Sequence, residues 1–346
     1  MKEKRIKILF TIPNFDTAGS GKALLNIVTR LDKKLFEPHI ACLHDKGEFF
    51  KVVEESGIPI HIFQFTTPMI GRIKGILHCW GISRQMKKIN PNLIHSFHYA
   101  PDYSEAIAAR MAGIPWIYTK KNMNWGGKSK NGWKLRSFLA THILAQNTDM
   151  MKYFFPYRKN VSLVPRGVDT DEFISQEKDA KLIHKYNILS HEKVILTVAN
   201  LVPIKGIEIL LEAFQKLSRK DGSIRLFIVG DKNSDYGKEM EKKAALNTHS
   251  RKIHFIGKVQ DVIKYYSITD IFVLPTLDEG RREGSPVSLL EAMSCNLPVI
   301  ASDISGVNDI LEPFSDTYFK AGDISALNNI LNKMLCNYNL YSGMKL

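Results

Sequence analysis

The sequence predicts an α/β protein made of two Rossmann-like domains, each built on a doubly wound parallel sheet. Short apolar runs alternate with longer amphipathic segments, which is the pattern of repeated strand–helix units. The alternation is interrupted once, over a polar and turn-rich stretch around residues 167–192, and then starts again. The length of 346 residues suits two ordinary domains. We therefore expect one domain over residues 1–170 and a second over residues 171–346.

Each domain is expected to contain several strands separated by helices. The strands of the first domain are predicted near Ile6–Ile12, His39–Leu43, Ile60–Phe63, Leu93–Ser96, Trp116–Thr119, Ile143–Gln146 and Ser162–Val164. The strands of the second are predicted near Val194–Ala199, Arg225–Val229, Ile253–Ile256, Ile271–Leu274 and Val299–Ala301. Amphipathic segments predict helices at Gly21–Leu31, Ser104–Ala112 and Ser325–Leu335, and the tail after Leu335 reads as short and weakly helical.

The chain carries a formal net charge of +13, and the excess is concentrated in the first domain. Residues 66–92 contain five Lys or Arg and no acid, with Ile73, Leu77 and Trp80 among them. Residues 120–160 are also basic and rich in Trp and Phe. Such surfaces suit the anionic inner leaflet of a membrane, although a solvated basic face is the simpler interpretation. No nucleic-acid-binding motif accompanies the charge, so nucleic acid is not an expected partner.

Cysteine usage and hydropathy indicate the compartment. The four cysteines are scattered, without a C-x-x-C pair or the spacing of metal ligands, which favours a reducing compartment and no structural zinc. The basic opening is interrupted by charges and Pro13, so it reads as a strand rather than a signal peptide. No apolar run reaches the ~18–20 residues of a membrane span. We expect a cytoplasmic protein, peripheral at the inner face of the plasma membrane.

The stretch from Glu283 to Glu291 is the main candidate for a binding site. Ser285 followed by Pro286 predicts a helix N-cap with proline in the first helical position. The free N–H groups of the first helical turn favour an anion, above all a phosphate. A phosphate there would have one carboxylate beyond each end, and each carboxylate could bind a sugar hydroxyl. The alternative is a buried helix start that the two glutamates merely cap and solvate.

Three further segments follow predicted strands. The turn of Gly19, Ser20 and Gly21 resembles a phosphate-binding loop, but the fingerprints of P-loops and dinucleotide folds both fail on neighbouring residues. Lys205, followed by glycine, could neutralise a phosphate at a helix start, or it could simply be solvated. His98 follows another strand and could donate to a sugar hydroxyl or exchange a proton near neutral pH. His95 is the weaker candidate, because it alternates with apolar positions and could merely end the strand.

Taken together, these segments resemble the family 4 retaining glycosyltransferases of GT-B fold, bacterial cell-surface polysaccharide type. The resemblance spans nearly the whole chain and is strongest over residues 160–325. It rests on the order and spacing of several motifs: the E-x7-E signature at Glu283–Glu291, Val164–Asp169, Leu201–Gly206, Phe227–Asp231, Phe255–Gly257, Asp270–Pro275 and Leu297–Ala301. It implies two domains that face a central cleft.

The resemblance implies a role for each candidate residue. Glu283 would face the donor sugar, Glu291 the nucleotide ribose, and Lys205 would balance the charge of the diphosphate. Gly284, Ser285, Pro286 and Val287 would approach the diphosphate, Lys258 and Val259 would border the base, and Gly19, Ser20 and Gly21 would close over the phosphates from the first domain. It implies no metal, because helix N-termini and Lys205 take over the charge neutralisation. It implies no cofactor, because the donor, expected to be a UDP-sugar, is a substrate. No protein nucleophile is implied either.

Several positions depart from the family pattern. Asn200 stands where the family commonly has arginine beside the phosphates, and Arg166, where asparagine is usual, could compensate. Lys121 stands where a histidine often follows the fifth strand. Extra charges lie between Thr276 and Glu283. The tail looks too short to cross back fully onto the first domain.

We therefore predict a metal-independent, retaining hexosyl- or N-acetylhexosaminyltransferase of surface polysaccharide biosynthesis. It would transfer a sugar to a glycan or lipid-linked acceptor, with Glu283, Lys205 and His98 as the catalytic candidates. Two alternatives remain within the same fold: a nucleotide-sugar epimerase, and a non-catalytic nucleotide-sugar-binding protein with a degenerate acceptor site. A nucleic-acid binder, suggested by charge alone, is a fourth reading.

Overall fold

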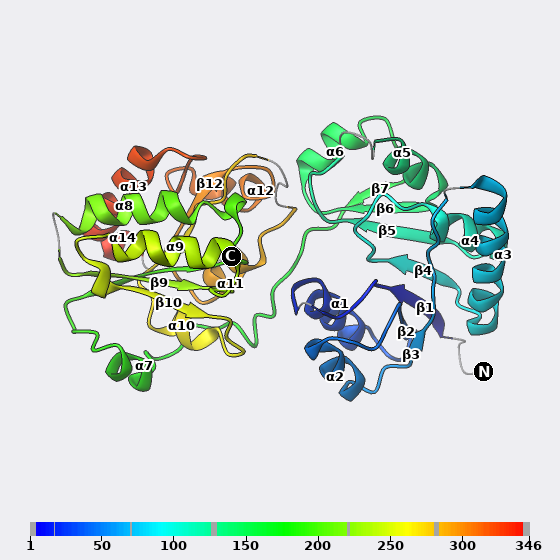
Figure 1. The fold of residues 1–346 in the computed structure, drawn as a ribbon, viewed down its shortest axis with the longest axis horizontal. Helices are drawn as coiled ribbons and strands as arrows, with labels where there is room; N and C mark the ends of the chain where they lie inside the picture. Colours follow the sequence, from blue (N-terminus) through cyan, green and yellow to red (C-terminus); the bar gives the residue numbers. More distant parts are fainter. Residues whose placement is uncertain are drawn as a thin grey trace. The chain divides into compact units, whose positions relative to one another are not determined.

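The computed structural model describes residues 5–16, 18–69, 71–125, 130–219, 222–279 and 284–341. The chain divides into two compact units (Figure 1). The first unit comprises residues 1–121 and 125–164, and the second comprises residues 122–124 and 165–346. The division after Val164 lies six residues before the boundary expected from the sequence, because the turn-rich segment that begins at Pro165 packs with the second unit.

The first unit is built on a seven-stranded sheet in the order β3-β2-β1-β4-β5-β6-β7, in which all neighbouring strands are parallel. Its strands are β1 (Ile6–Thr11), β2 (Phe36–Cys42), β3 (Ile60–Ile62), β4 (Leu93–Ser96), β5 (Trp116–Lys120), β6 (His142–Ala145) and β7 (Val161–Leu163). Its helices are α1 (Ala18–Arg30), α2 (Glu48–Glu55), α3 (Arg72–Ile89), α4 (Ser104–Ala112), α5 (Lys130–Leu139) and α6 (Thr148–Phe154).

The second unit is built on a six-stranded sheet in the order β10-β9-β8-β11-β12-β13, again parallel throughout. Its strands are β8 (Lys193–Val198), β9 (Ile224–Val229), β10 (Ile253–Gly257), β11 (Ile271–Leu274), β12 (Val299–Asp303) and β13 (Tyr318–Lys320). Its α-helices are α7 (Ala180–Lys185), α8 (Ile207–Ser218), α9 (Asp235–Ala245), α10 (Ile263–Ser267), α11 (Val287–Ser294), α12 (Asn308–Leu311), α13 (Ile324–Cys336) and α14 (Tyr338–Tyr341). Short 3₁₀ turns include η2 (Pro203–Lys205).

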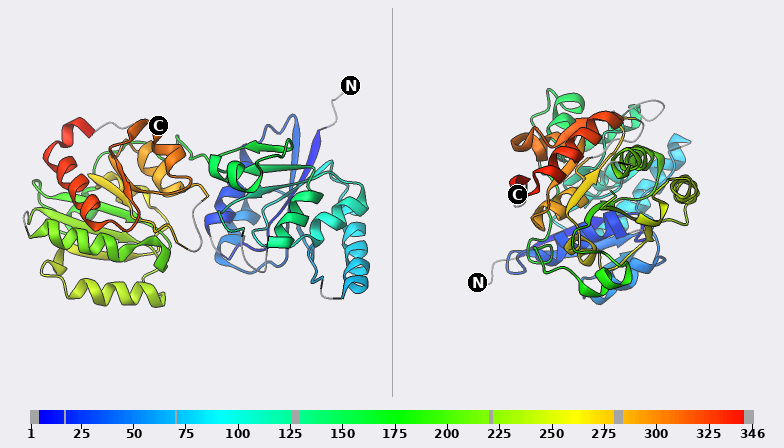
Figure 2. Two further views of the ribbon diagram at one scale, coloured as in Figure 1. Left: turned by 90° about the horizontal axis from the view of Figure 1, so that it is seen from above. Right: turned by 90° about the vertical axis from the view of Figure 1, so that its left-hand side faces the viewer.

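Helices cover both faces of each sheet (Figures 1 and 2), which is why the strands are apolar on both sides. Successive residues of a strand point to opposite faces. In the second unit, Leu196 and Phe272 therefore join α10 and α11 in one core cluster, while the neighbouring Ile195 and Ile271 join α8 and α13 in another. The first unit has the same two-sided core. The prediction of two Rossmann-like parallel-sheet domains is confirmed.

Two elements differ from the sequence-based expectation. The edge strand β13 was not predicted, because the sequence around its one buried side chain, Phe319, is mostly polar and contains no apolar run. The segment after α13 forms the short helix α14, whose Tyr341 hydroxyl donates to Asp316 at 2.8 Å and whose Tyr338 ring lies 4.0 Å from the Lys193 ammonium. These contacts hold α14 on the second unit. Within the described ranges, no helix is both long enough and apolar enough to span a membrane.

Each sheet has one place where the strand order reverses. In the first sheet it lies between β1 and β4, and in the second between β8 and β11. In open α/β sheets, ligands bind at such switch points, beyond the carboxyl ends of the strands. The segments that follow β1, β4, β8 and β11 are therefore the places in which to look for function.

Candidate donor and acceptor sites

The loops after β8 and β11 are packed backbone against backbone at the switch point of the second sheet. Gly206 has φ +61°, and a Cβ atom there would lie 2.1 Å from the Pro275 carbonyl oxygen. The Leu277 amide donates to the Ile204 carbonyl at 2.8 Å. Only glycine allows this approach. As a result, Lys205, which is half-buried at the end of η2, is held directly beside the loop that leads to α11.

The loops after β9 and β10 complete the same edge of the sheet. A Cβ atom at Gly230, directly after β9, would lie 2.1 Å from the Ala199 carbonyl oxygen, so this loop also approaches the β8 loop by its main chain. Lys258, after β10, forms a 2.9 Å ion pair with Asp231. Val259 is half-buried against the core. Lys258 and Val259 thus lie at the carboxyl edge of the sheet, with strands β9 and β8 between β10 and β11.

Helix α11 starts one residue later than the sequence predicted. Pro286 is the N-cap, with an extended conformation (ψ 105°), and Val287 is the first helical residue. Ser285 was expected to be the cap, but it lies before Pro286 and is buried. None of the side chains that the structure describes forms a capping hydrogen bond at the N-terminus of α11. By contrast, the first amide of α8, that of Ile207, already donates a hydrogen bond to the Tyr236 hydroxyl at 3.2 Å. The first turn of α11 is thus the better anion site of the two.

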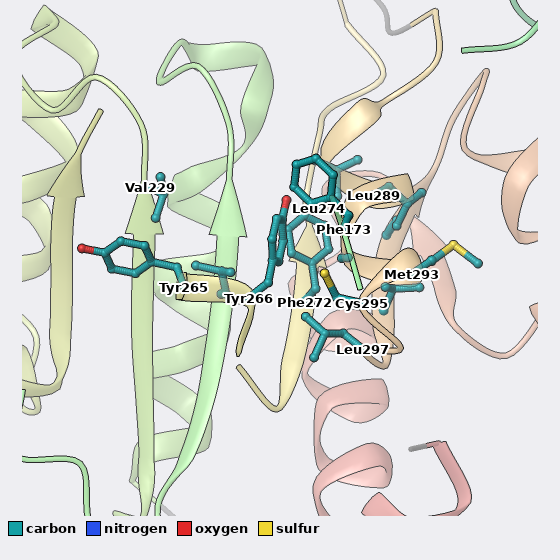
Figure 3. Close-up of a cluster of buried hydrophobic side chains, with 14 of the residues drawn as sticks. Phe173, Val229, Tyr265, Tyr266, Phe272, Leu274, Leu289, Met293, Cys295 and Leu297 are labelled. Carbon is teal, nitrogen blue, oxygen red and sulfur yellow. The ribbon is translucent and has the colours of Figure 1, made fainter. Parts of the chain in front are cut away.

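Glu283 lies outside the described residues, so its predicted place is not assessed. Glu291 lies in the second turn of α11 and is half-buried. Its Oε2 accepts a 3.0 Å hydrogen bond from the hydroxyl of Tyr266, which is 1% exposed. Tyr266 belongs to the cluster drawn in Figure 3, together with Phe173 and Phe272. Burial, and then the charge of Glu291, raise the pKa of Tyr266, so its hydroxyl stays protonated and donates.

The remaining donor-side candidates lie on loops of the same unit. Asn200 is exposed two residues after β8. Arg166 is half-buried in the segment that follows β7 and is part of the second unit. Gly284 is buried in the β11–α11 loop, three residues before the first helical residue of α11. No group of three or more His, Cys, Asp or Glu placed to hold a metal ion occurs among the residues that the structure describes.

The glycine segment of the first unit differs slightly from expectation. Gly19, Ser20 and Gly21 lie inside the first turn of α1, which starts at Ala18, rather than in a loop before it. A Cβ atom at Gly21 would lie 2.9 Å from the Phe15 ring, so the absence of a side chain here allows that ring to pack against α1. A Cβ atom at Gly19 would meet nothing within 4 Å. The backbone at Gly19 is thus open at the switch point after β1.

His98 follows β4 at the other side of this switch point. Burial, the positive charge of Arg136 and that of Lys121 lower the pKa of His98 to about 3. Its Nδ1 is buried without a hydrogen-bond partner among described groups. This shift keeps the His98 imidazole neutral near pH 7, which does not favour the proton exchange considered from the sequence. The imidazole can instead hydrogen-bond a ligand hydroxyl.

His95 and Lys121 have structural contacts. His95 is buried, and its Nε2 lies 2.8 Å from the Thr119 hydroxyl, which matches the alternative that it only closes the strand. Lys121, after β5, donates to the Phe97 carbonyl oxygen and lies over the Phe97 and Tyr99 rings. Lys121 thus braces the segment that carries His98.

Comparison with known proteins decides the family. A model described as Glycosyltransferase Family 4 matches residues 17–172, and a model described as Glycosyl transferases group 1 matches residues 178–345. Together they cover nearly the whole chain. The chain is a family 4 glycosyltransferase. The resemblance inferred from the E-x7-E signature and the accompanying motifs is confirmed.

Bacterial glycosyltransferases are similar to this enzyme over most of their length. The putative glycosyltransferase EpsF of Bacillus subtilis is 24% identical over 88% of this chain and 80% of its own. An uncharacterized glycosyltransferase of Haemophilus influenzae is 29% identical over 98% and 93%. The UDP-Gal:alpha-D-GlcNAc-diphosphoundecaprenol alpha-1,3-galactosyltransferase of Escherichia coli is 25% identical over 91% and 84%.

Solved structures share the fold of the glycosyltransferase. A glycosyltransferase of Rickettsia africae matches with a TM-score of 0.84 at 19% identity, covering 98% of this chain and 91% of that one. Anabaena HepE in complex with UDP and glucose matches with a TM-score of 0.79 at 18% identity, covering 98% and 92%. The GT-B architecture is thus confirmed.

Sequence reasoning missed three side chains of this glycosyltransferase that support its site residues. Tyr266 holds Glu291, while Arg136 and Glu105 are buried beneath the segment that carries His98. A polar residue at an otherwise apolar position of a predicted helix is the only signal that could have found Arg136 or Glu105. Their partners lie up to 94 positions away in the sequence, as for Glu105 and Thr11.

Proposed function

We propose that the enzyme is a retaining, metal-independent glycosyltransferase that transfers a hexose or N-acetylhexosamine from a UDP-sugar to a glycan or lipid-linked acceptor. The second unit would bind the donor and the first unit the acceptor. The observation that carries this proposal is the close packing of Gly206 on Pro275, which fixes Lys205 beside the loop entering the uncapped N-terminus of α11. Both features favour a diphosphate.

In the proposed reaction, the bond from the anomeric carbon to the diphosphate oxygen breaks, and a bond from the same carbon to the acceptor oxygen forms on the same face of the sugar. The acceptor proton passes to the departing diphosphate. Lys205 and the first-turn amides of α11 stabilise the charge that develops on the diphosphate, which is the main catalytic contribution. Glu291, oriented by Tyr266, binds the ribose, and Glu283 faces the donor sugar. His98 hydrogen-bonds the acceptor as a neutral imidazole.

The proposed place of action is the cytoplasmic face of a membrane, in surface polysaccharide biosynthesis. Helix α3 supports it, because four apolar side chains with helical spacing are exposed along it: Ile73, Ile76, Leu77 and Trp80. The Arg84 guanidinium lies 4.9 Å from the Trp80 ring, so charge and apolar surface are adjacent. An amphipathic basic helix of this kind suits an anionic lipid surface. The similarity to the Escherichia coli UDP-Gal:alpha-D-GlcNAc-diphosphoundecaprenol alpha-1,3-galactosyltransferase supports a lipid-linked acceptor.

The test uses radiolabelled UDP-glucose, UDP-galactose and UDP-N-acetylglucosamine, with N-acetylglucosamine on a polyprenyl diphosphate as the acceptor probe. Wild type should form a product with α-linkage retained, without added metal and in the presence of EDTA. Lys205→Ala and Glu283→Ala should abolish transfer while keeping the melting temperature. Full activity in either variant would overturn the assigned roles. UDP release without acceptor, together with an altered sugar, would instead indicate an epimerase, and UDP-sugar binding without turnover on these probes or on acceptor extracts would indicate a binding protein.

A further inference from the structure

The segment between β4 and α4, residues 97–103, is held by a buried guanidinium. Arg136 of α5 is 0% exposed. Its Nη1 donates to the carbonyl oxygens of Ala100 at 3.3 Å and Asp102 at 2.6 Å, and its Nη2 donates to that of His98 at 3.1 Å. Three carbonyl groups of one short segment therefore point at a single side chain from another element.

A carboxylate balances this charge from the opposite side of Ser96. The Arg136 Nη2 also donates to the Ser96 hydroxyl at 3.1 Å. That hydroxyl donates to Glu105 at 2.7 Å, and the Thr11 hydroxyl donates to the other oxygen of Glu105 at 2.5 Å. The network thus links β1 and β4, the two strands of the switch point. Burial of a charge is tolerated only with such compensation.

The geometry requires arginine rather than lysine. The guanidinium carbon of Arg136 lies 4.9 Å from the ring centres of both Trp116 and Tyr118. A planar fork can stack against aromatic rings while its separate N–H groups reach several carbonyls, whereas an ammonium is a compact point charge. Lysine at this position would keep the charge but lose most of the contacts to the segment.

We propose that Arg136 is a positioning residue, which fixes residues 97–103 so that His98 is presented to the acceptor. The inference rests on the proposed function, in which the first unit binds the acceptor. Arg136 itself touches no substrate. It acts through the carbonyl of His98 and those of the two residues that flank Pro101, which leaves the imidazole to bind the ligand.

The experiment compares Arg136→Lys with the double variant Glu105→Gln/Arg136→Met, which removes both buried charges and leaves neither unpaired. The first readout is hydrogen exchange of peptides covering residues 97–103, followed by mass spectrometry. The second is KM for the polyprenyl-diphosphate N-acetylglucosamine probe and for the UDP-sugar that wild type uses. Lys134→Met, an exposed position of the same helix, serves as the control.

Exchange should rise at least tenfold in residues 97–103 of both variants, with the sheets and the second unit unchanged. KM for the acceptor should rise at least tenfold while KM for the donor stays within twofold. Unchanged exchange in the segment would overturn the inference, as would faster exchange with an unchanged acceptor KM or an equal rise in donor KM. If wild type transfers to no probe, the proposed function fails, and the exchange data alone decide whether Arg136 fixes the segment.

Discussion

The Tyr266 hydroxyl and the Glu291 carboxylate are joined by a 3.0 Å hydrogen bond that ties α11 to the core of the second unit. Tyr266 also donates to the Ser288 carbonyl at 3.2 Å, so one buried hydroxyl contacts two successive turns of α11. The bond fixes Oε2 of the half-buried Glu291 carboxylate, which suits the role proposed for it, binding a neighbouring hydroxyl in a fixed direction.

Tyr266→Phe should therefore weaken donor binding. Loss of a hydrogen bond to a charged group costs about 1.5–3 kcal/mol. We expect donor binding to lose about 1.4 kcal/mol, which is a tenfold rise in KM for the UDP-sugar, because Glu291 keeps its place on the helix. Tyr265→Phe is the matched control, since Figure 3 shows the Tyr265 ring extending away from Tyr266, Leu289 and Met293. Isothermal calorimetry with UDP measures the effect, and equal losses in both variants would contradict the assignment.

Gly206→Ala should disable the donor site. The new methyl group would lie 2.1 Å from the Pro275 carbonyl oxygen, and φ +61° is a strained conformation for alanine. The loop must shift and carry Lys205 with it, so kcat should fall at least a hundredfold, with a loss of about 1–3 kcal/mol in unfolding free energy. Gly81→Ala in α3, where a Cβ atom meets nothing within 4 Å, should leave kcat unchanged. Wild-type kcat in Gly206→Ala would refute the prediction.

Lys120→Met should stabilise the protein at neutral pH. Lys120 is 1% exposed, and its ammonium lies 3.9 Å from the Trp133 ring centre. Burial, and then the charge of Arg136, lower its pKa from 10.5 to about 7. Because the unfolded chain binds this proton up to about pH 10.4 and the folded protein only up to about pH 7, the unfolding free energy should rise with pH between those values.

The unfolding free energy of Lys120→Met should lack that rise with pH, and at pH 6 it should exceed the wild-type value by on the order of 3 kcal/mol. Urea unfolding at several pH values measures it. Tyrosine and cysteine titrations in the same range are common to both proteins, so the difference between wild type and variant is the informative quantity. Lys134→Met, at an exposed position of α5, is the control. An identical pH dependence in Lys120→Met and wild type would show that Lys120 is charged in the fold.

Ile73→Ser/Leu77→Ser/Trp80→Ser should weaken membrane binding. These side chains are exposed on α3, so their loss removes apolar contact with lipid without opening the core. We expect at least tenfold weaker binding to phosphatidylglycerol vesicles in a flotation assay. Leu246→Ser, at an exposed leucine of the second unit, should bind like wild type. Equal binding by all three proteins would remove α3 as the contact surface.

The sequence was sufficient to predict what depends on local pattern. Helix α4 was predicted to its last residue, because Gly113, with φ +74°, ends it. The parallel sheets followed from apolar runs that repeat at regular intervals. The predicted start of α11 was one residue too early. Proline is generally favoured at the first helical position, but here Pro286 is the residue before the first helical one.

What could not be predicted depends on contacts between distant segments. In the sequence, Arg136 is one more base of the basic stretch 120–160, for which a solvated face was the simpler interpretation. Only the packed structure shows that it is buried against Trp116 and Tyr118. His98 was chosen as a candidate from its place after a predicted strand. Its lowered pKa was not predicted, because that pKa depends on burial and on the charges of Arg136 and Lys121. Strand β13 was missed because Phe319 is flanked by polar residues and does not belong to an apolar run.

The main-chain packing at Gly206 and Gly230 has a consequence for changing donor specificity. At both positions a methyl group would overlap a carbonyl oxygen of a neighbouring loop, so random mutagenesis should return almost only glycine there. The backbone at the start of α8 and after β9 should therefore tolerate no residue larger than glycine at these two positions. New sugar or nucleotide preferences would have to arise from side chains carried on the neighbouring backbone, such as Asn200, Lys258 and Val259, whose backbone positions can be kept while their chemistry changes.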